Sequence, residues 1–475
     1  MASKSQKEEK VFTPQKVKFD PFEFVSLYKM EIKKSIYDHT RVVIEGAIDE
    51  ENVAKYERYL AKEDPKLMIN HSNQDNKILF KGIIQDYDII YKRQDYYLTL
   101  EAVSYSILLK RVRPNRIYQN LGTTYKQVLD KIMQDNSKFN IVFGDNSQAQ
   151  TVLTTKNYPM ALQYKESEWD FLKRISSYLD QPVIVDDTKD DKESINILIG
   201  LHNATAKELN NISGVKRKKT GRKNHKFNYY KVDCHEHFRS KEVYNIGKKV
   251  KYRLTNQKDQ TIDLIVIKNR IYIEEGVLCS DLTLVKEEDI NILQERREIP
   301  IEGRSFRAKV MKLNKDHTAQ VDFIDIADEY NEAKSFHFPI DRNYTDSYFA
   351  PEVDDIVDIY FKSKNEKHAT LKSSSTDSAK KIDHKPTDKL IITPGGYKIR
   401  LNNGNIFISG KDDKSLVEIK EETMKMKSAK GTVFMTSDEI KVTRKNGDVS
   451  LDNSQTKLKF SGKEVQISSG GINMV

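Results

Sequence analysis

The chain has 475 residues, enough for about three to five domains of ordinary size. Apolar residues make up only 37% and charged residues 32%, so each hydrophobic core must be thin. The net charge of +9 is a small bias on a densely charged surface and does not by itself indicate a nucleic-acid partner. The modest glycine and proline content excludes a disordered or collagenous chain.

Two cysteines, Cys234 and Cys279, exclude the disulfide framework of small secreted domains. The first residues are polar and charged, so we expect no signal peptide. No apolar run in the sequence approaches the ~18 residues that a membrane-spanning helix needs. We therefore expect synthesis and folding in a reducing cytoplasm, with any action outside the cell as part of a larger particle.

Most of the chain alternates apolar and polar side chains with period two, which is typical of half-buried strands, and residues 1–115 are the first such region. The pattern predicts strands at 41–48, 78–84, 87–91 and 96–103, with a hairpin loop at 92–95. Such a meander indicates a small β-barrel or sandwich, the first of two predicted barrels.

Residues 116–185 predict a helix-containing insert. Thr124 and Gln127 fit a capping box at the start of one helix. Ser167 can cap a second helix with Asp170 three residues on. Trp169, Leu172, Ile175 and Leu179 share one face of that helix, which indicates a core role for it.

Residues 186–300 return to strand patterns and predict a second barrel, similar in style to the first. Its basic segment 216–223 could bind nucleic acid or an anionic envelope polymer, but no aromatic residues interleave the charges. We expect a solvated loop there. His235 and His237 would face one side of a strand and could bind a metal ion, but no third and fourth ligand lie nearby in the sequence. A structural role is the simpler interpretation, and metal binding stays open.

Residues 301–372 contain four or five short predicted strands, which suit an OB-type barrel. Residues 373–387 have the composition of a linker. Residues 388–475 repeat short alternating pieces every ~8–12 residues, each with one apolar stripe and no helix to cover it. Stacking into a solenoid or winding of identical chains would cover these stripes. We favour the second, because so short a segment has little core of its own.

Two segments resemble the hub-and-spike proteins of contractile injection systems, the late-control protein D and VgrG-type family. Gln163–Ile175 is similar to the family's hub signature, an acidic-Ser-acidic-Trp-Asp-Phe stretch that opens a helix. Pro351–Phe361 resembles its OB-domain signature, with Asp354 where the family usually has Gly. The order of the domains also agrees, and the resemblance covers nearly the whole chain.

The resemblance implies a mainly β fold with a small α+β insert: two hub β-barrels, an OB-fold barrel and a C-terminal intertwined trimeric β-helix or β-prism. Three copies would form a pseudo-sixfold ring that adapts a threefold spike to a sixfold tail tube. The expected partners are the sister chains, the tail tube and baseplate proteins, the target envelope and a separate tip protein docked on the C-terminal end. We expect no specific nucleic-acid partner and no cofactor. We also expect no metal ion at the needle apex, because the last histidine, His384, precedes the needle.

The residues expected to matter are structural, and no catalytic residue is predicted. They are the hub helix Trp169, Phe171, Leu172 and Ile175; the OB turn Pro351, Glu352, Val353 and Asp355; and a needle interior of Ile399, Leu401, Ile406, Ile408, Ile440, Val442, Leu458, Phe460, Val465 and Ile467. Two rival functions are a tail-tip cell-wall hydrolase and a receptor-binding tail fibre. The sequence does not distinguish a phage tail, a bacteriocin and a secretion device.

Overall fold

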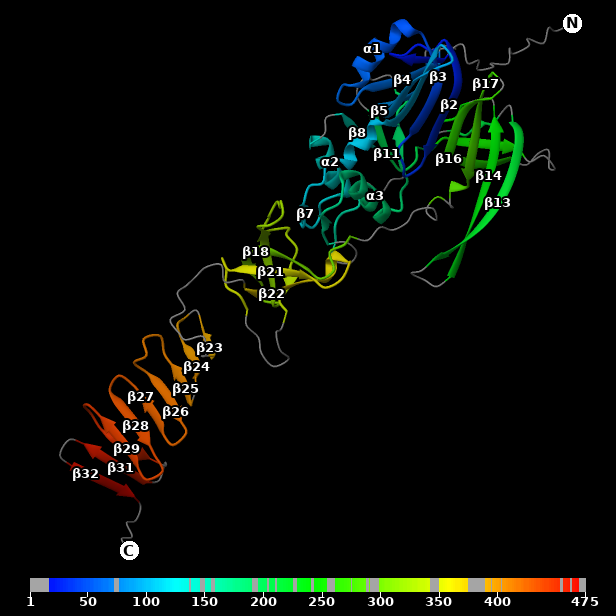
Figure 1. The fold of residues 1–475 in the computed structure, drawn as a ribbon. Coiled ribbons are helices and arrows are strands. Elements are labelled where there is room, and N and C mark those ends of the chain that lie inside the picture. Colours follow the sequence, from blue (N-terminus) through cyan, green and yellow to red (C-terminus); the bar gives the residue numbers. More distant parts are fainter. Residues whose placement is uncertain are drawn as a thin grey trace, which may run out of the picture. The chain divides into compact units, whose positions relative to one another are not determined.

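The computed structural model of the chain divides into two compact units, residues 1–376 and 377–475. Strands dominate both units, so the predicted mainly β fold is confirmed (Figure 1). Among the described residues, no helix has the length and apolar character to cross a lipid bilayer. The structure describes residues 17–71, 77–135, 138–145, 150–154, 159–189, 195–202, 205–209, 212–224, 229–240, 243–253, 261–274, 276–287, 290, 299–341, 350–374, 389–393, 395–402, 404–452, 456–461 and 464–469.

The first strand group and helix α1 (Glu50–Leu60) form the N-terminal part of the first unit. Apolar residues alternate along its strands, so side chains such as Ile44 and Leu100 are completely buried. Helix α1 adds the buried Tyr56 and Leu60 to this core. The strands are β1 (Val17–Asp20), β2 (Ser26–Ser35), β3 (Arg41–Ile48), β4 (Lys66–His71), β5 (Lys77–Lys92) and β6 (Asp95–Ser104).

Strand β5 corrects one sequence expectation. The predicted strands 78–84 and 87–91 are a single strand, interrupted only by a register irregularity between Ile84 and Asp86. The hairpin at 92–95 turns through Arg93 and Gln94, which both have positive φ angles of 54° and 68°. Such backbone matches the twist of a two-residue hairpin, which explains why the turn is so tight.

The second strand group continues the same sheet. Strand β2 pairs with β16 (Thr261–Glu274), so both groups belong to one 12-stranded sheet. Each strand group has its own hydrophobic core. The basic segment 216–223 lies in a strand, which corrects its interpretation as a loop. The remaining strands are β12 (Lys207–Glu208), β13 (Ile212–Asn224), β14 (Tyr229–Ser240), β15 (Lys249–Arg253) and β17 (Val277–Val285).

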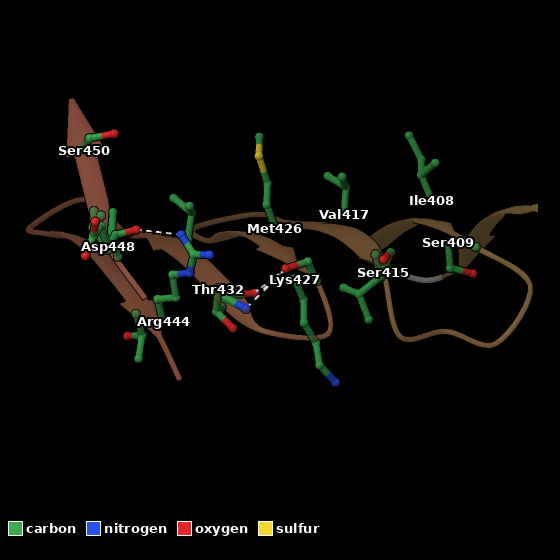
Figure 2. Close-up of a pocket in the computed structure, with 18 of the residues that line it drawn as sticks. Ile408, Ser409, Ser415, Val417, Met426, Lys427, Thr432, Arg444, Asp448 and Ser450 are labelled. Carbon is green, nitrogen blue, oxygen red and sulfur yellow. Dashed lines mark hydrogen bonds between the residues drawn. The ribbon is translucent and has the colours of Figure 1, made fainter. Parts of the chain in front are cut away.

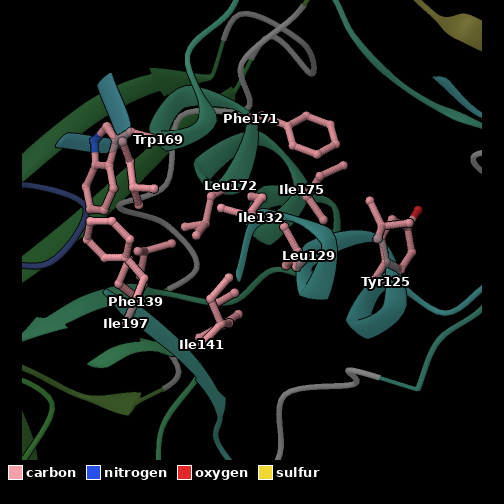
Figure 3. Packing of buried hydrophobic residues seen from close by; sticks show 14 of the residues in the cluster. Tyr125, Leu129, Ile132, Phe139, Ile141, Trp169, Phe171, Leu172, Ile175 and Ile197 are labelled. Carbon is pink, nitrogen blue, oxygen red and sulfur yellow. The ribbon is translucent and has the colours of Figure 1, made fainter. Parts of the chain in front are cut away.

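The insert packs two helices, α2 (Tyr125–Asp135) and α3 (Glu168–Tyr178), against a three-stranded sheet (Figure 3). The predicted capping box is confirmed: the Thr124 N–H donates to Gln127 Oε1 at 2.8 Å, and the Gln127 N–H donates to Thr124 Oγ1 at 3.1 Å. A 3₁₀ helix, η2 (Tyr105–Lys110), leads into the insert. The three-stranded sheet of the insert consists of β8 (Phe139–Phe143), β10 (Val183–Asp186) and β11 (Ile195–Ile199). A two-stranded sheet consists of β7 (Arg116–Tyr118) and β9 (Ala161–Gln163).

A five-stranded sheet follows, which we call the small barrel (residues 299–374). Its strand order is β20-β19-β18-β21-β22, and a parallel bridge between Ile340 and Leu371 joins the two ends of that order. Its core also takes in Ile117 and Leu162 from the insert. The strands are β18 (Arg304–Leu313), β19 (Thr318–Phe323), β20 (Phe338–Pro339), β21 (Ile356–Phe361) and β22 (Ala369–Ser374), with the 3₁₀ helix η4 (Glu366–His368) before β22.

The second unit is a ladder of short antiparallel strands in sequence order (Figure 1, orange to red). Its seven-stranded sheet, which we call the tail sheet, consists of β23 (Lys389–Ile392), β24 (Lys398–Asn402), β25 (Asn405–Ser409), β26 (Leu416–Lys420), β27 (Met424–Lys427), β28 (Gly431–Met435) and β29 (Ile440–Arg444). A three-stranded sheet follows, with β30 (Val449–Asp452), β31 (Thr456–Ser461) and β32 (Glu464–Ser469).

Candidate assembly surface

One face of the tail sheet carries apolar side chains on every strand, with the charged Lys389 of the first strand and Arg444 of the last strand at its ends. Directly paired residues of neighbouring strands lie on the same face, as do residues two apart on one strand. The register therefore gives two adjacent rows across the sheet. The first row is Ile391, Ile399, Ile408, Val417, Met426, Val433 and Val442; the second is Leu401, Ile406, Ile419, Met424, Met435 and Ile440.

Nothing in the described part of the chain covers this apolar face. Not one described side chain of the second unit is buried, whereas the first unit holds all the described core residues. Ile408 is 45% exposed, Val442 46% and Ile440 67%. Aliphatic side chains on one continuous face are rarely left in water over such an extent, which marks the face as an interaction surface.

The opposite face is mixed and suits contact with water. Lys398, Lys427 and Thr443 occupy it by register. It also carries the aromatic residues Phe407 and Phe434, and Arg400 partly covers Phe407 with its guanidinium 4.5 Å from the ring centroid. The tail sheet is thus amphipathic, with one face to be covered and one to be solvated.

Figure 2 shows how the apolar face is built. Ile408, Val417 and Met426 come from three successive strands and project side by side to the same side of the sheet, while Lys427 and Thr432 point the other way. A hollow of about 700 Å³ is lined by residues of β25 to β30 and of the turns between them. Covering a half-exposed aliphatic side chain contributes about 1 kcal/mol, so burial of both rows contributes on the order of 10 kcal/mol for each chain before entropy.

Six of the ten needle-interior residues named from the sequence fall on this face. Ile399, Leu401, Ile406, Ile408, Ile440 and Val442 belong to the two rows. Leu458 and Phe460 lie in β31, where the backbone pairs them with Ile467 and Val465, whose side chains are outside the described residues. The same period-two alternation also places seven further residues on this face: Ile391, Val417, Ile419, Met424, Met426, Val433 and Met435.

The hub-helix residues lie in a different place and have a different role. Trp169, Phe171, Leu172 and Ile175 are completely buried in the core of the insert (Figure 3). Ser167 begins the helix, and its Oγ accepts a hydrogen bond from the Asp170 N–H at 3.1 Å, as the sequence predicts.

Trp169 has a partner that the sequence does not indicate. The ring of His39, 130 positions earlier in the chain, packs on it with 4.3 Å between centroids. His39 Nδ1 lies 2.7 Å from Ser106 Oγ. Burial, together with the charges of Lys110, Arg41 and Lys173, lowers the pKa of His39 to about 3, while Asp38 opposes this shift. The imidazole is therefore neutral at physiological pH.

The predicted OB turn is a tight reversal that pairs with β18. The Glu352 N–H donates to Asp355 Oδ2 at 2.7 Å, and the Asp354 N–H donates to the Val310 carbonyl at 2.8 Å. Asp354 has a φ of 75°, the left-handed conformation in which glycine is favoured. Val353 is 50% exposed and Pro351 is half-buried, so these residues shape a turn rather than a core.

The histidine pair lies on β14. The backbone register places His235 opposite Lys218 and His237 opposite Lys216. Their side chains are outside the described residues. Within the part of the chain that the structure describes, no group of three or more His, Cys, Asp or Glu side chains could hold a metal ion.

The order of the parts defines a class of fold: a large β hub with a helical insert, then a small five-stranded barrel, then a β-ladder tail. No family model matches the sequence, and no curated protein matches it. Solved structures do match it in fold.

One is the c3393 protein of E. coli, described as a component of the type VI secretion system with structural similarity to the T4 bacteriophage tail proteins gp27 and gp5. It superposes with a TM-score of 0.52 at 14% identity, over 76% of this chain and 99% of that one. A chain of the lidded Francisella PdpA–VgrG complex gives 0.55 at 10% identity, over 89% and 76%. A chain of the lidless PdpA–VgrG complex gives 0.54 at 10%, over 88% and 93%.

At such identities these matches establish the fold alone. The resemblance to VgrG-like hub-and-spike proteins, carried in the sequence by two short motifs, is confirmed at the level of the fold.

Proposed function

We propose that this chain is a structural baseplate hub and envelope-puncturing spike of a contractile phage tail or phage-tail-like particle, and not an enzyme. The observation that carries the proposal is the uncovered apolar face of the tail sheet. The shared fold with a type VI secretion component and with chains of a PdpA–VgrG complex supports the same assignment.

Two sister chains cover the apolar face of each tail sheet. Each strand of the tail sheet from β24 to β29 places two apolar side chains on this face, and β23 places one, so the sheet is a narrow ribbon. Seven strands spaced ~4.8 Å apart make that ribbon roughly 30 Å long. Three such ribbons, apolar faces inward, close a prism whose interior the side chains fill. Two facing ribbons would leave their long edges open to water.

A prism of this kind suits puncturing. Separating the chains would expose all rows at once, so the needle would resist splaying under compression. In the hub, two strand groups from each of three chains would give six similar parts and so adapt a threefold spike to a sixfold tail tube. The remaining partners are the tube and baseplate proteins, the target envelope and a separate tip protein on the C-terminal end.

Two adjacent residues on opposite faces test the proposal. Val442 belongs to the apolar face and Thr443 to the solvated face. Val442→Asp would bury three carboxylates in one layer of the prism, which costs several kcal/mol for each. Light scattering should show a monomer for Val442→Asp and a trimer for Thr443→Asp. Equal masses for the two variants would contradict the proposed use of this face.

The rival functions have their own tests. Clearing of purified peptidoglycan in a zymogram would replace the proposal with a cell-wall hydrolase. Electron microscopy of particles labelled on this chain should place it on the particle axis, and a peripheral position would indicate a receptor-binding fibre.

A further inference from the structure

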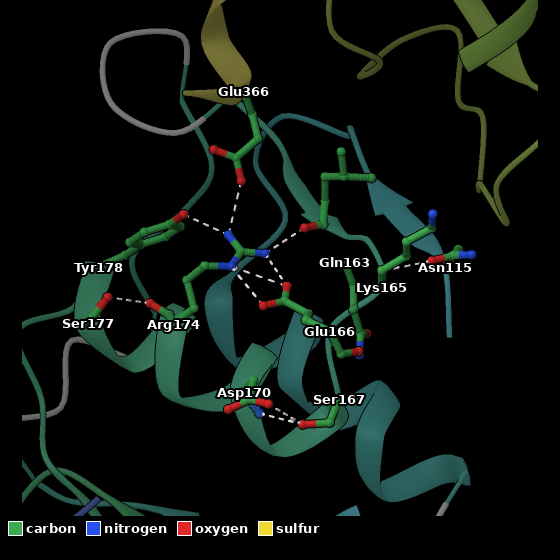
Figure 4. A network of polar contacts seen from close by, with 11 residues as sticks. Asn115, Gln163, Lys165, Glu166, Ser167, Asp170, Arg174, Ser177, Tyr178 and Glu366 are labelled. Atoms are coloured by element: carbon green, nitrogen blue, oxygen red, sulfur yellow. Dashed lines mark hydrogen bonds and ion pairs between the residues drawn. The ribbon is translucent and has the colours of Figure 1, made fainter. Parts of the chain in front are cut away.

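Arg174 in helix α3 is completely buried, and every one of its N–H groups donates a hydrogen bond (Figure 4). Nε donates to both carboxylate oxygens of Glu166, at 3.2 and 3.3 Å. Nη1 donates to Tyr178 Oη at 2.6 Å and to Glu366 Oε1 at 3.0 Å. Nη2 donates to the Leu162 carbonyl and to Glu166 Oε1. A guanidinium offers five N–H donors, so none is left unsatisfied.

These partners belong to two parts of the first unit. Glu166, Tyr178 and Leu162 belong to the insert, but Glu366 belongs to η4 of the small barrel, 192 positions away. Its side chain is 2% exposed. Burial alone would lower the pKa of Arg174, but Tyr178, Glu166 and Glu366 raise it above its ordinary value, so the side chain stays charged.

The surrounding joint holds strand β7 against the small barrel by backbone hydrogen bonds. The Ile117 N–H donates to the Ala327 carbonyl at 2.9 Å, and the Leu121 N–H donates to the Lys334 carbonyl at 2.8 Å. The Phe336 N–H donates back to the Gln119 carbonyl at 3.0 Å. These three amides report directly on whether the joint is closed.

The other side of the insert is held in a similar way. Lys34 of β2 pairs with Asp187, which follows β10, and both side chains are at most 5% exposed. The insert is therefore tied by a water-excluded ion pair to the first strand group on one side and to the small barrel on the other. Apolar packing alone is non-directional, whereas a guanidinium bound at fixed angles sets an orientation.

We infer that the Arg174–Glu366 pair is a latch that fixes the small barrel to the insert in one orientation. Its use in transmitting force from hub to spike rests on the proposed function, but the latch itself does not. Removing Arg174 leaves the Glu366 carboxyl buried without its counter-ion. Removing the charge of Glu366 takes from Arg174 its partner in the small barrel, while Glu166 of the insert still pairs with it, so either change opens the joint.

Hydrogen exchange of the full chain, followed by mass spectrometry, tests the latch. Glu366→Gln keeps the shape of the side chain and removes its charge. Arg174→Lys keeps the positive charge and removes the planar guanidinium with its five N–H donors. Each variant should speed exchange at the Ile117, Leu121 and Phe336 amides at least tenfold. The Val310 amide, which donates to Asp355 inside the small barrel, should change less than twofold.

Arg307→Gln is the matched control, because it breaks an exposed ion pair with Asp325 on the same barrel. It should leave exchange at the joint unchanged. Unchanged exchange at the joint in Glu366→Gln and Arg174→Lys would overturn the inference. An equal loss of protection at Val310 would also overturn it, because the pair would then belong to the folding core of the barrel. If the chain were monomeric and the two variants still sped exchange only at the joint, the latch would be supported and the proposed trimeric spike would be refuted.

Discussion

Acid should destabilise the insert through His39, which is buried against Trp169 and held neutral. Its pKa of about 3 in the folded chain lies below the ordinary 6.5 that the unfolded chain would show. Above pH 6.5 both states are neutral at this position, and the stability contribution is complete. As the pH falls below 6.5, His39 takes up a proton in the unfolded chain but not in the folded chain, so the free energy of unfolding decreases.

The size of the loss follows from the two pKa values. Between pH 7 and pH 5 the linkage amounts to about 2 kcal/mol. His39 is 2% exposed and faces the basic Lys110, Arg41 and Lys173, so solvent screening does little to reduce the effect. A loss of this size changes the ratio of folded to unfolded insert roughly thirtyfold.

Trp169 is the single tryptophan of the chain, so its fluorescence reports on unfolding next to His39. Urea unfolding at pH 7 and pH 5 should show the loss in the natural chain. His39→Asn keeps a group able to bond Ser106 but cannot take up the proton, so it should lose about 2 kcal/mol less over the same interval. Parallel pH dependences in the two chains, or titration of His39 near pH 6.5, would refute the reasoning.

Three substitutions test local geometry, each by urea unfolding at pH 7. Ser167→Ala removes the cap on the Asp170 N–H and should cost about 1 kcal/mol; an unchanged midpoint would exclude the cap. Gly82→Ala would place a Cβ 2.2 Å from the Val103 carbonyl oxygen, so it should cost more than about 2 kcal/mol, and tolerance would contradict this close approach. Asp354→Val should cost about 1–2 kcal/mol and Asp354→Gly almost nothing, because the φ is positive; equal effects would contradict that conformation.

Local sequence patterns predicted local structure well. The capping groups of Thr124 and Ser167 were readable because their partners lie three residues away. The apolar face of the tail sheet followed from period-two alternation, which needs no knowledge of distant contacts. Helix α1 was missed since it sits in a charged stretch between strands, with only Tyr56 and Leu60 buried.

Contacts between distant segments could not be predicted in this way. The pairing of β2 with β16 joins residues more than 200 positions apart, and no local pattern specifies which strand edges meet. The same holds for Arg174 and Glu366, since a chain rich in carboxylates offers many equivalent partners. His39 looks like any histidine near a turn until the fold brings Trp169 against it.

The mass of the full chain in solution tests the central claim most directly. Light scattering at micromolar concentration should give three times the 55.2 kDa of one chain, because the apolar rows of the tail sheet need sister chains to cover them. A mass of 55.2 kDa with the tail sheet folded would contradict the account, since the exposed rows would then be stable in water without a partner.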